Sequence, residues 1–154
     1  MTGPSQFVRR SLCVGVSAVA ILAAGCATMP KGQAALSGSQ EVPPVTTNAT
    51  GTTDISALLS KCPTAASGFN CPTVYGSVVV NGVAATAAHI HMAPAGQNGP
   101  VVVPLVKVSD TVFAVPGATT LTNDQWEAYQ NGLLYVNVHS AANPGGEIRA
   151  QLKR

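Results

Sequence analysis

The sequence predicts an all-β domain, folded as a sandwich or barrel of short strands, with one short helix. Two observations lead to this prediction. Runs rich in Val, Thr and Ile alternate with clusters of Gly, Pro, Asn and Ser, a spacing typical of β-sandwiches and barrels. The chain has 154 residues, of which 46% are hydrophobic and 9% are charged, so it has room for one core and a short additional segment.

The predicted strands follow the β-rich runs. They cover residues 51–59, 73–80, 85–92, 101–108, 133–140 and 147–152. Asn81-Gly82 is a strong type I′ turn signal, so we expect it to join the strand that ends at Val80 to the next one as a hairpin.

One helix is predicted over residues 122–130. Thr122 and Gln125 have the spacing of a capping box at its start, and a glycine stop signal follows its end. Trp126 and Tyr129 share one face of this helix. We expect that face to be buried, because a lone Trp on the apolar side of a short helix is usually a core residue.

The first 25 residues predict an export signal peptide. Arg9 and Arg10 precede an apolar run over residues 12–24, which is too short for a mature membrane span and ends in small residues. The sequence Leu-Ala-Ala-Gly-Cys resembles a lipobox, which implies that Cys26 is lipidated and becomes the new N-terminus. An ordinary cleaved signal peptide is the alternative. The paired arginines leave a twin-arginine export route open beside the general one.

Residues 26–35 are then a lipidated tether, because they contain Pro, Lys, Gly and Gln with little apolar content, and residues 36–154 form the domain. Position 27 is Ala rather than Asp, which by resemblance to Gram-negative lipoproteins implies the outer membrane. We therefore expect a cell-envelope protein that contacts the membrane through its lipid and faces the periplasm or the cell surface. The formal charge is only +2, and the sequence has no basic cluster in its central part, so nucleic-acid binding is not indicated.

The cysteines predict one disulfide. Cys13 lies in the signal peptide and Cys26 would carry lipid, which leaves Cys62 and Cys71 in the domain. Two cysteines in an oxidising compartment are expected to pair, and the turn-rich stretch between them can bring them together. A metal site at these cysteines is the alternative, but structural zinc needs four ligands and no histidine or third cysteine lies nearby.

Three separated motifs resemble the pattern of the CHRD (chordin) domain family, and together they span nearly the whole mature chain. The resemblance implies an immunoglobulin-like or Cu,Zn superoxide dismutase-like Greek-key β-sandwich, and no settled activity. The insert around Cys62 and Cys71 departs from the pattern and lengthens one hairpin. The motifs are Leu-Ser-Gly-Ser-Gln-Glu-Val-Pro-Pro at 36–44, Ala-His-Ile-His at 88–91 with Gly-Pro-Val-Val at 99–102, and Leu-Tyr-Val-Asn-Val-His at 134–139 with Pro-Gly-Gly-Glu-Ile-Arg at 144–149.

The three histidines of the chain are the candidate metal ligands. His89 and His91 alternate along one predicted strand, and His139 lies opposite the apolar face of another. We therefore expect all three imidazoles to point away from the core on an exposed sheet face. Three such ligands suit one copper ion, with zinc as the second candidate. Solvated strand histidines that bind no metal are the alternative.

Glu147 and Arg149 alternate along the last predicted strand. Without binding a metal themselves, these two side chains could orient one of the histidines. The simpler interpretation, which we favour at this point, is a surface ion pair worth under about 1 kcal/mol.

The leading functional prediction is a lipid-anchored binding module, without catalytic residues, that carries a three-histidine copper site. A His-x-His pair with a distant third histidine also resembles the copper side of Cu,Zn superoxide dismutase. That enzyme needs a bridging fourth histidine, and this chain has three. A structural or protein-interaction domain without metal and a redox or dismutase-like enzyme are the two alternatives. The identity of any protein partner is left open.

Overall fold

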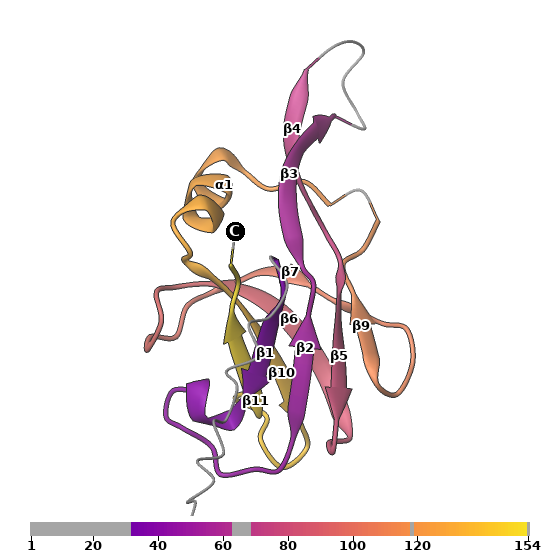
Figure 1. Ribbon diagram of the computed structural model, residues 1–154, viewed down its shortest axis with the longest axis vertical. Helices are drawn as coiled ribbons and strands as arrows, with labels where there is room; N and C mark the ends of the chain where they lie inside the picture. Colours follow the sequence, from indigo (N-terminus) through magenta and orange to yellow (C-terminus); the bar gives the residue numbers. More distant parts are fainter. Residues whose placement is uncertain (1–31, 63–68, 118, 154) are drawn as a thin grey trace, which may run out of the picture.

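The computed structural model describes residues 32–62, 69–117 and 119–153, in which strands dominate (Figure 1). The predicted signal peptide, Cys26 and most of the tether lie outside the described residues. Among the described helices, none is both long and apolar enough to cross a membrane. The helices are the 3-10 turn η1 (Gly38–Gln40) and α1 (Asn123–Gln130), and the strands are β1 (Ala34–Ser37), β2 (Thr50–Thr53), β3 (Ser56–Lys61), β4 (Asn70–Tyr75), β5 (Ser77–Asn81), β6 (Ala85–Met92), β7 (Val101–Pro104), β8 (Val106–Lys107), β9 (Val112–Ala114), β10 (Leu134–Ser140) and β11 (Ile148–Gln151).

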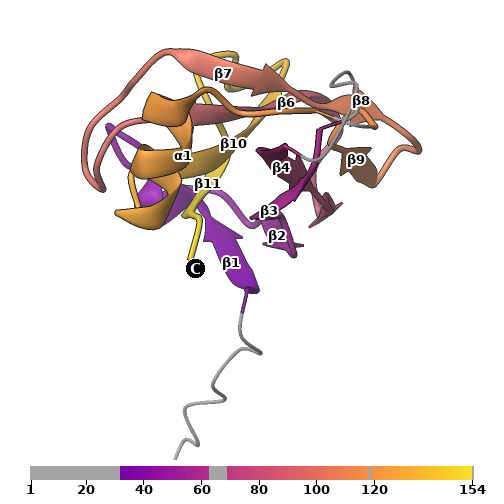
Figure 2. The same cartoon turned by 90° about the horizontal axis from the view of Figure 1, so that it is seen from above.

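Nine of the strands form one sheet that curls over itself into a sandwich (Figure 2). Their order is β7-β6-β10-β11-β1-β2-β5-β9-β8. Leu105 alone separates β7 from β8, which are the two ends of this order, so the sheet nearly closes on itself. β3 and β4 form a separate two-stranded sheet. The predicted all-β sandwich with one short α-helix is confirmed.

The hydrophobic core lies inside the curled sheet. Along β6, β10 and β11 every second side chain points inward, and Ile90, Val136, Val138 and Ile148 are all 0% exposed. The side chains between them, which include the three histidines, point to the opposite face. The alternation expected from the sequence is therefore present on all three strands.

The opposite face of β6, β10 and β11 is covered by loops. Tyr135 and Arg149 are each 1% exposed, and His91 is 9% exposed. Three connections pack onto this face: residues 38–45, residues 93–100 and the turn 141–147. The expectation of an exposed sheet face is therefore wrong, because the loops that join the strands fold back over it.

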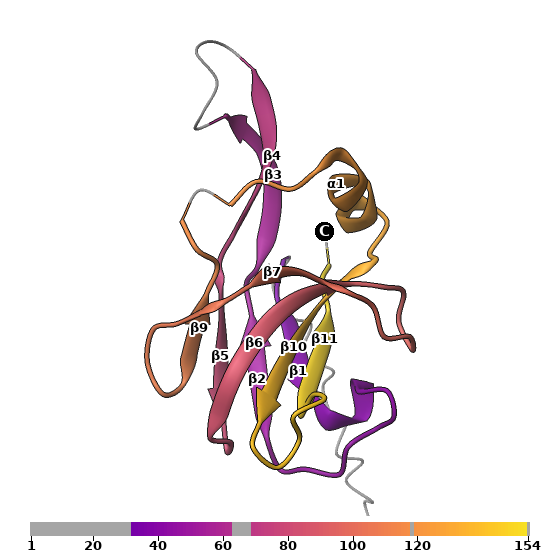
Figure 3. The same ribbon diagram turned by 180° about the vertical axis from the view of Figure 1, so that it is seen from behind.

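Three of the predicted strands are interrupted: the run 101–108 divides at Leu105, and two other runs divide at the same level of the molecule. The run 51–59 divides into β2 and β3, and the run 73–80 divides into β4 and β5 at Gly76. Gly76 has a φ of 111°, and a Cβ at this position would lie 2.8 Å from Ile55 Cα, so a side chain does not fit. The two strand pairs are one long, bent hairpin whose outer half, β3 and β4, leaves the main sheet (Figure 3).

The Asn81-Gly82 turn does not form the predicted hairpin. Gly82 has the positive φ of a turn, 71°, but β5 pairs with β2 and β9, whereas β6 pairs with β7 and β10. Because both edges of β5 are occupied, the turn carries the chain across to the other side of the sandwich. β9 is not among the predicted strands, and β1 begins at Ala34, inside the predicted tether.

Helix α1 is capped as predicted. Thr122 Oγ1 accepts a hydrogen bond from Gln125 N at 3.2 Å, and Gln125 Oε1 accepts one from Thr122 N at 3.0 Å. Tyr129 is buried and Trp126 is partly buried, and their rings stack with centroids 5.8 Å apart. Trp126 is therefore a packing residue of the core, as expected.

The predicted disulfide is present at the outer end of the β3–β4 hairpin. The Cα atoms of Cys62 and Cys71 are 5.0 Å apart, and Cys62 N donates to Phe69 O at 3.0 Å. The bond therefore closes the hairpin directly after β3.

We expect Cys62→Ser combined with Cys71→Ser to loosen the outer hairpin while the sandwich stays folded. A disulfide that closes a loop of this size contributes about 2 to 3 kcal/mol when the whole domain unfolds as one unit. The hairpin lies outside the main sheet and can open by itself, so the free energy of global unfolding should fall by less than this. Thermal unfolding and hydrogen exchange at Lys61 and Asn70 measure the two effects. Unchanged exchange together with the full loss of stability would contradict local opening.

Candidate metal centre

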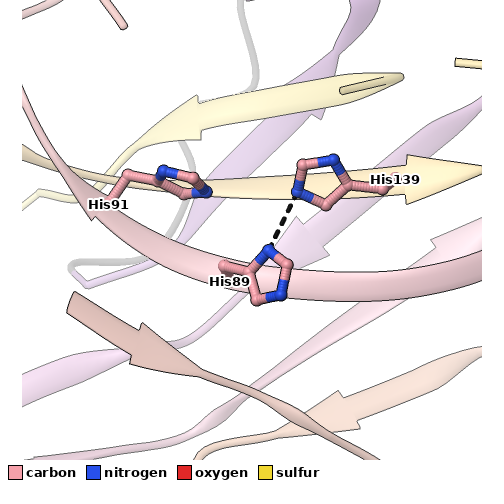
Figure 4. Close-up of side chains that lie close together, drawn as sticks. All are labelled: His89, His91 and His139. Atoms are coloured by element: carbon pink, nitrogen blue, oxygen red, sulfur yellow. Dashed lines mark hydrogen bonds between the residues drawn. The ribbon is translucent and has the colours of Figure 1, made fainter. Parts of the chain in front are cut away.

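The three histidines come from two neighbouring antiparallel strands and lie on the same sheet face (Figure 4). His89 and His91 alternate along β6, and His139 lies near the end of β10, where it pairs with Ala87. The alternation of side chains along paired strands brings these residues together. All three residues that the sequence predicted as metal ligands therefore meet in one place.

One nitrogen from each ring lies within 4.8 Å of the other two. His89 Nδ1 and His139 Nε2 are 3.0 Å apart. The His91 ring is further away, with its centroid 5.7 Å from that of His89 and 6.1 Å from that of His139. Two nitrogens bound to one ion at about 2.0 Å lie roughly 3.3 to 3.5 Å from each other, so small ring movements would complete a three-nitrogen site.

Backbone carbonyls determine which nitrogen two of the rings present. His91 Nδ1 lies 3.0 Å from Gly99 O, and His139 Nδ1 lies 3.0 Å from Pro144 O. A carbonyl oxygen only accepts, so Nδ1 carries the hydrogen in both rings and Nε2 keeps a lone pair. His91 Nε2 is buried and has no hydrogen-bond partner among the described residues. Imidazole held in this tautomer is ready to bind a metal ion.

His89 presents Nδ1 rather than Nε2. Because His139 Nε2 holds a lone pair, His89 Nδ1 donates the hydrogen bond between them (Figure 4). To bind a metal through Nδ1, the ring of His89 would move its hydrogen to Nε2. That change joins two neutral tautomers, so it requires no net loss of a proton.

The pKa values of all three imidazoles lie below the usual 6.5. Burial is the main cause in each ring, because a charged imidazole is costly in a desolvated position. Electrostatic repulsion from the other two imidazoles lowers the pKa of His89 further. Repulsion from His139 and Arg149 does the same for His91. The hydrogen bonds of His91 and His139 to backbone carbonyls act in the opposite direction. The rings are therefore neutral, and able to bind a metal, at neutral pH.

His91 is held in place by a stack of side chains. Tyr135 lies against it with ring centroids 4.9 Å apart and planes at 13°, and the Tyr135 hydroxyl accepts from Gly99 N at 3.1 Å. The Arg149 guanidinium carbon lies 3.5 Å from the centre of the Tyr135 ring. Gly99 is thus a shared support: its carbonyl holds His91 and its N–H holds Tyr135.

Arg149 is buried, and it contacts both the loop over residues 93–100 and the ring of Tyr135. Its Nη1 donates to Gln97 O at 2.8 Å and its Nη2 donates to Pro94 O at 3.3 Å. These bonds fix the loop that leads to Gly99. Arg149 therefore supports His91 through Tyr135 and through this loop.

Glu147 supports the other side of the centre. Its carboxylate accepts hydrogen bonds from Thr47, Ser140 and Asn143, and these bonds lower its pKa. They hold the turn that presents the Pro144 carbonyl to His139. The expected surface ion pair between Glu147 and Arg149 is wrong, because each side chain is buried and bound to a different loop.

Glu41 and Asn137 belong to the same buried polar face, although the sequence did not single them out. Asn137 Nδ2 donates to Glu41 Oε2 at 3.3 Å, and Glu41 is 5% exposed. Burial raises the pKa of Glu41 to about 7, against the opposing attraction of Arg149. For Asn137 the signal was present, since it alternates with Tyr135 and His139 along β10. For Glu41 strand periodicity gave no signal, because it does not place a loop residue, and its position in the motif at residues 36–44 was the only indication.

We expect Glu41→Gln to make the stability of the domain less dependent on pH. With a folded-state pKa of about 7 against an ordinary value of 4.5, the folded protein binds this proton more tightly than the unfolded chain. The stability that protonation of Glu41 contributes to the wild type is therefore lost as the pH rises from about 4.5 to about 7. The variant, which stays neutral, should melt above the wild type at pH 8 and close to it at about pH 4.5. Melting curves across this range measure the effect, and Glu127→Gln, at an exposed carboxylate of α1, is the control.

The comparison with known protein families identifies the family of this chain. Residues 32–152 match the model of the CHRD domain. No curated protein and no solved structure shows significant similarity to the chain. The match covers well over half of the sequence and includes every strand of the described residues and the three histidines, and on this basis the chain belongs to the CHRD domain family.

Proposed function

We propose that this protein is a lipid-anchored binding module of the cell envelope that holds one copper ion between His89, His91 and His139. The observation that supports the proposal best is the convergence of three imidazole nitrogens within 4.8 Å of one another. Two of these rings, His91 and His139, are fixed with the lone pair on Nε2, by hydrogen bonds from Nδ1 to backbone carbonyls. Such an arrangement resembles a prepared ligand set more than three unrelated surface residues.

The chemistry of the donors favours a transition metal. All three are neutral nitrogens, and their lowered pKa values keep them unprotonated at neutral pH. Hard cations such as calcium and magnesium prefer oxygen ligands. Imidazole nitrogen suits copper and zinc.

Copper is favoured over zinc by affinity, because a given nitrogen site binds copper more tightly than zinc in the order of divalent metals. The cluster of candidate ligands found among the described residues contains the three histidines alone, which is too few for a structural zinc site with its four protein ligands. Three histidines with an open position also suit a catalytic zinc, so zinc remains the second candidate. A three-coordinate copper ion would have a position open to a further ligand.

We expect alanine at any one of the three histidines to lower the copper affinity by more than about a hundredfold, since even residues behind the ligands contribute about ten- to hundredfold. The fold should persist, because none of these side chains belongs to the hydrophobic core. The measurement is a copper titration of the purified protein against a competing chelator. Asp110→Asn, at a fully exposed carboxylate, is the matched control and should bind as the wild type does.

Affinity should also fall as the pH falls, because a protonated ring cannot act as a ligand. The lowered imidazole pKa values place this loss below the ordinary imidazole range around 6.5. Equal affinity in the wild type and the three alanine variants would instead favour an interaction module without metal. Turnover of superoxide by the copper-loaded protein would favour the dismutase-like enzyme.

The second part of the proposal is the anchor at Cys26. The sequence supports it through the basic residues, the apolar run and the small residues before the cysteine. We expect the mass of the protein purified from the envelope to include a diacylglyceryl group on an N-terminal Cys26. Cys26→Ser should abolish fatty-acid incorporation, and a mature protein that begins elsewhere, without added lipid, would contradict the anchor.

A further inference from the structure

The outer hairpin formed by β3 and β4 carries half of the exposed large hydrophobic residues of the described chain. They are Leu58 (43% exposed), Leu59 (54%), Phe69 (74%) and Tyr75 (46%), of eight such residues. Figures 1 and 3 show the hairpin projecting beyond the sandwich and α1. A projecting element on which exposed apolar side chains gather is a candidate interaction site.

The apolar residues lie on both faces of the hairpin. Side chains alternate along the strands, so Leu58 shares one face with Tyr75, while Leu59 shares the other with its cross-strand partner Pro72. A flat protein surface could cover only one of these faces. The headgroup and acyl-chain boundary of a bilayer can surround both, so the shape of this wedge favours a lipid surface.

The charge of the hairpin also suits a membrane. Between Ser56 and Tyr75 the sequence contains Lys61 and no Asp or Glu. The single basic side chain adds a weak attraction to an anionic bilayer beside the exposed apolar residues, and no acidic side chain of the hairpin opposes it. Cys62 and Cys71 close the hairpin next to Lys61, so these residues are held in position before any contact is made.

The path of the chain places the hairpin close to the proposed anchor. A Cβ built on Gly32 would lie 3.3 Å from Ser56 Oγ, so the chain enters the domain beside the base of the hairpin. Six steps along the chain separate Cys26 from Gly32, which allows at most about 21 Å between them. β3 extends about 20 Å from the same point. The tether therefore confines the base of the hairpin to a distance from the bilayer that the hairpin can bridge.

We infer that the β3–β4 hairpin is a second membrane contact, with Leu59 and Phe69 entering the interface of the bilayer that holds the lipid at Cys26. The inference rests on the proposed lipid anchor. The tether keeps the hairpin at a high local concentration near the bilayer, so a weak affinity of the hairpin itself is sufficient. The contact would fix the orientation of the domain on the membrane, which a flexible tether alone does not do.

The test measures the depth of a fluorophore. Trp126 is the single tryptophan of the chain, so Trp126→Phe gives a silent background. In that background Phe69→Trp places an indole on the hairpin, and Val108→Trp places the control indole in the exposed turn between β8 and β9. The full lipidated protein is reconstituted into phosphatidylethanolamine and phosphatidylglycerol vesicles with brominated acyl chains. We expect a blue shift and bromine quenching for the indole at position 69 and neither for that at position 108.

An indole at position 69 that stays as exposed as the control would overturn the inference. Protection of position 69 in native envelopes but not in vesicles would overturn it as well, in favour of a protein partner. Intact mass reports the lipid on the same sample, so failure of the anchor is recognised separately. If the lipid is absent, the unlipidated protein is added to the same vesicles, where quenching at position 69 upholds the contact and its absence overturns it.

Discussion

The burial of both faces of β6, β10 and β11 is the constraint on which the rest of the structure depends. One face packs into the hydrophobic core, as any sandwich strand must. The other face carries polar and charged side chains that are also removed from water, and such groups are tolerated only when they find partners. The loops over residues 38–45, 93–100 and 141–147 provide most of these partners through backbone carbonyls and short polar side chains. Among the described residues, Glu41 Oε1, His91 Nε2 and Asn137 Oδ1 stay buried without a partner. The connections are therefore structural parts of the domain.

This second face buries both acidic and basic side chains. Burial disfavours the charged form of each, so it shifts the pKa values of the acid and the bases in opposite directions. Desolvation raises the pKa of Glu41 and lowers those of the three histidines. Arg149 stays charged because its guanidinium is bound by carbonyl oxygens and lies over the Tyr135 ring. Desolvation keeps all three imidazoles neutral, and the positive charge of Arg149 adds to this effect at His91, so the lone pairs of the rings stay unprotonated.

The sequence was sufficient for the parts of the structure that depend on local chemistry. The strand alternation around His89, His91 and His139, the capping box at Thr122 and the pairing of Cys62 with Cys71 all follow from residue types at fixed spacings. The failures concern how distant segments pack. Asn81-Gly82 is a turn as expected, yet the strands on either side of it belong to different parts of the sheet, which turn chemistry does not encode.

At the candidate site, too, local residue patterns were predictable and the packing of distant segments was not. Periodicity along β6 and β10 placed the three histidines on one face, but it did not show that loops bury that face. Glu41 reaches Asn137 from a loop 96 residues away in the chain, and no local pattern connects them. Arg149 and Glu147 were recognised as neighbours of the site, and their partners were misjudged for the same reason.

Gly99 shows how such a face constrains sequence variation. Its N–H and its carbonyl hold Tyr135 and His91, and the space beside it is taken by the carbonyl of Met92, so that a Cβ has no room. One added methyl group would thus displace the support of an imidazole without altering any candidate ligand. Divergent copies of the domain can therefore keep all three histidines and still lose the arrangement of their rings. Among related sequences, the residue at this position is as informative as the histidines about which copies keep the three imidazoles together.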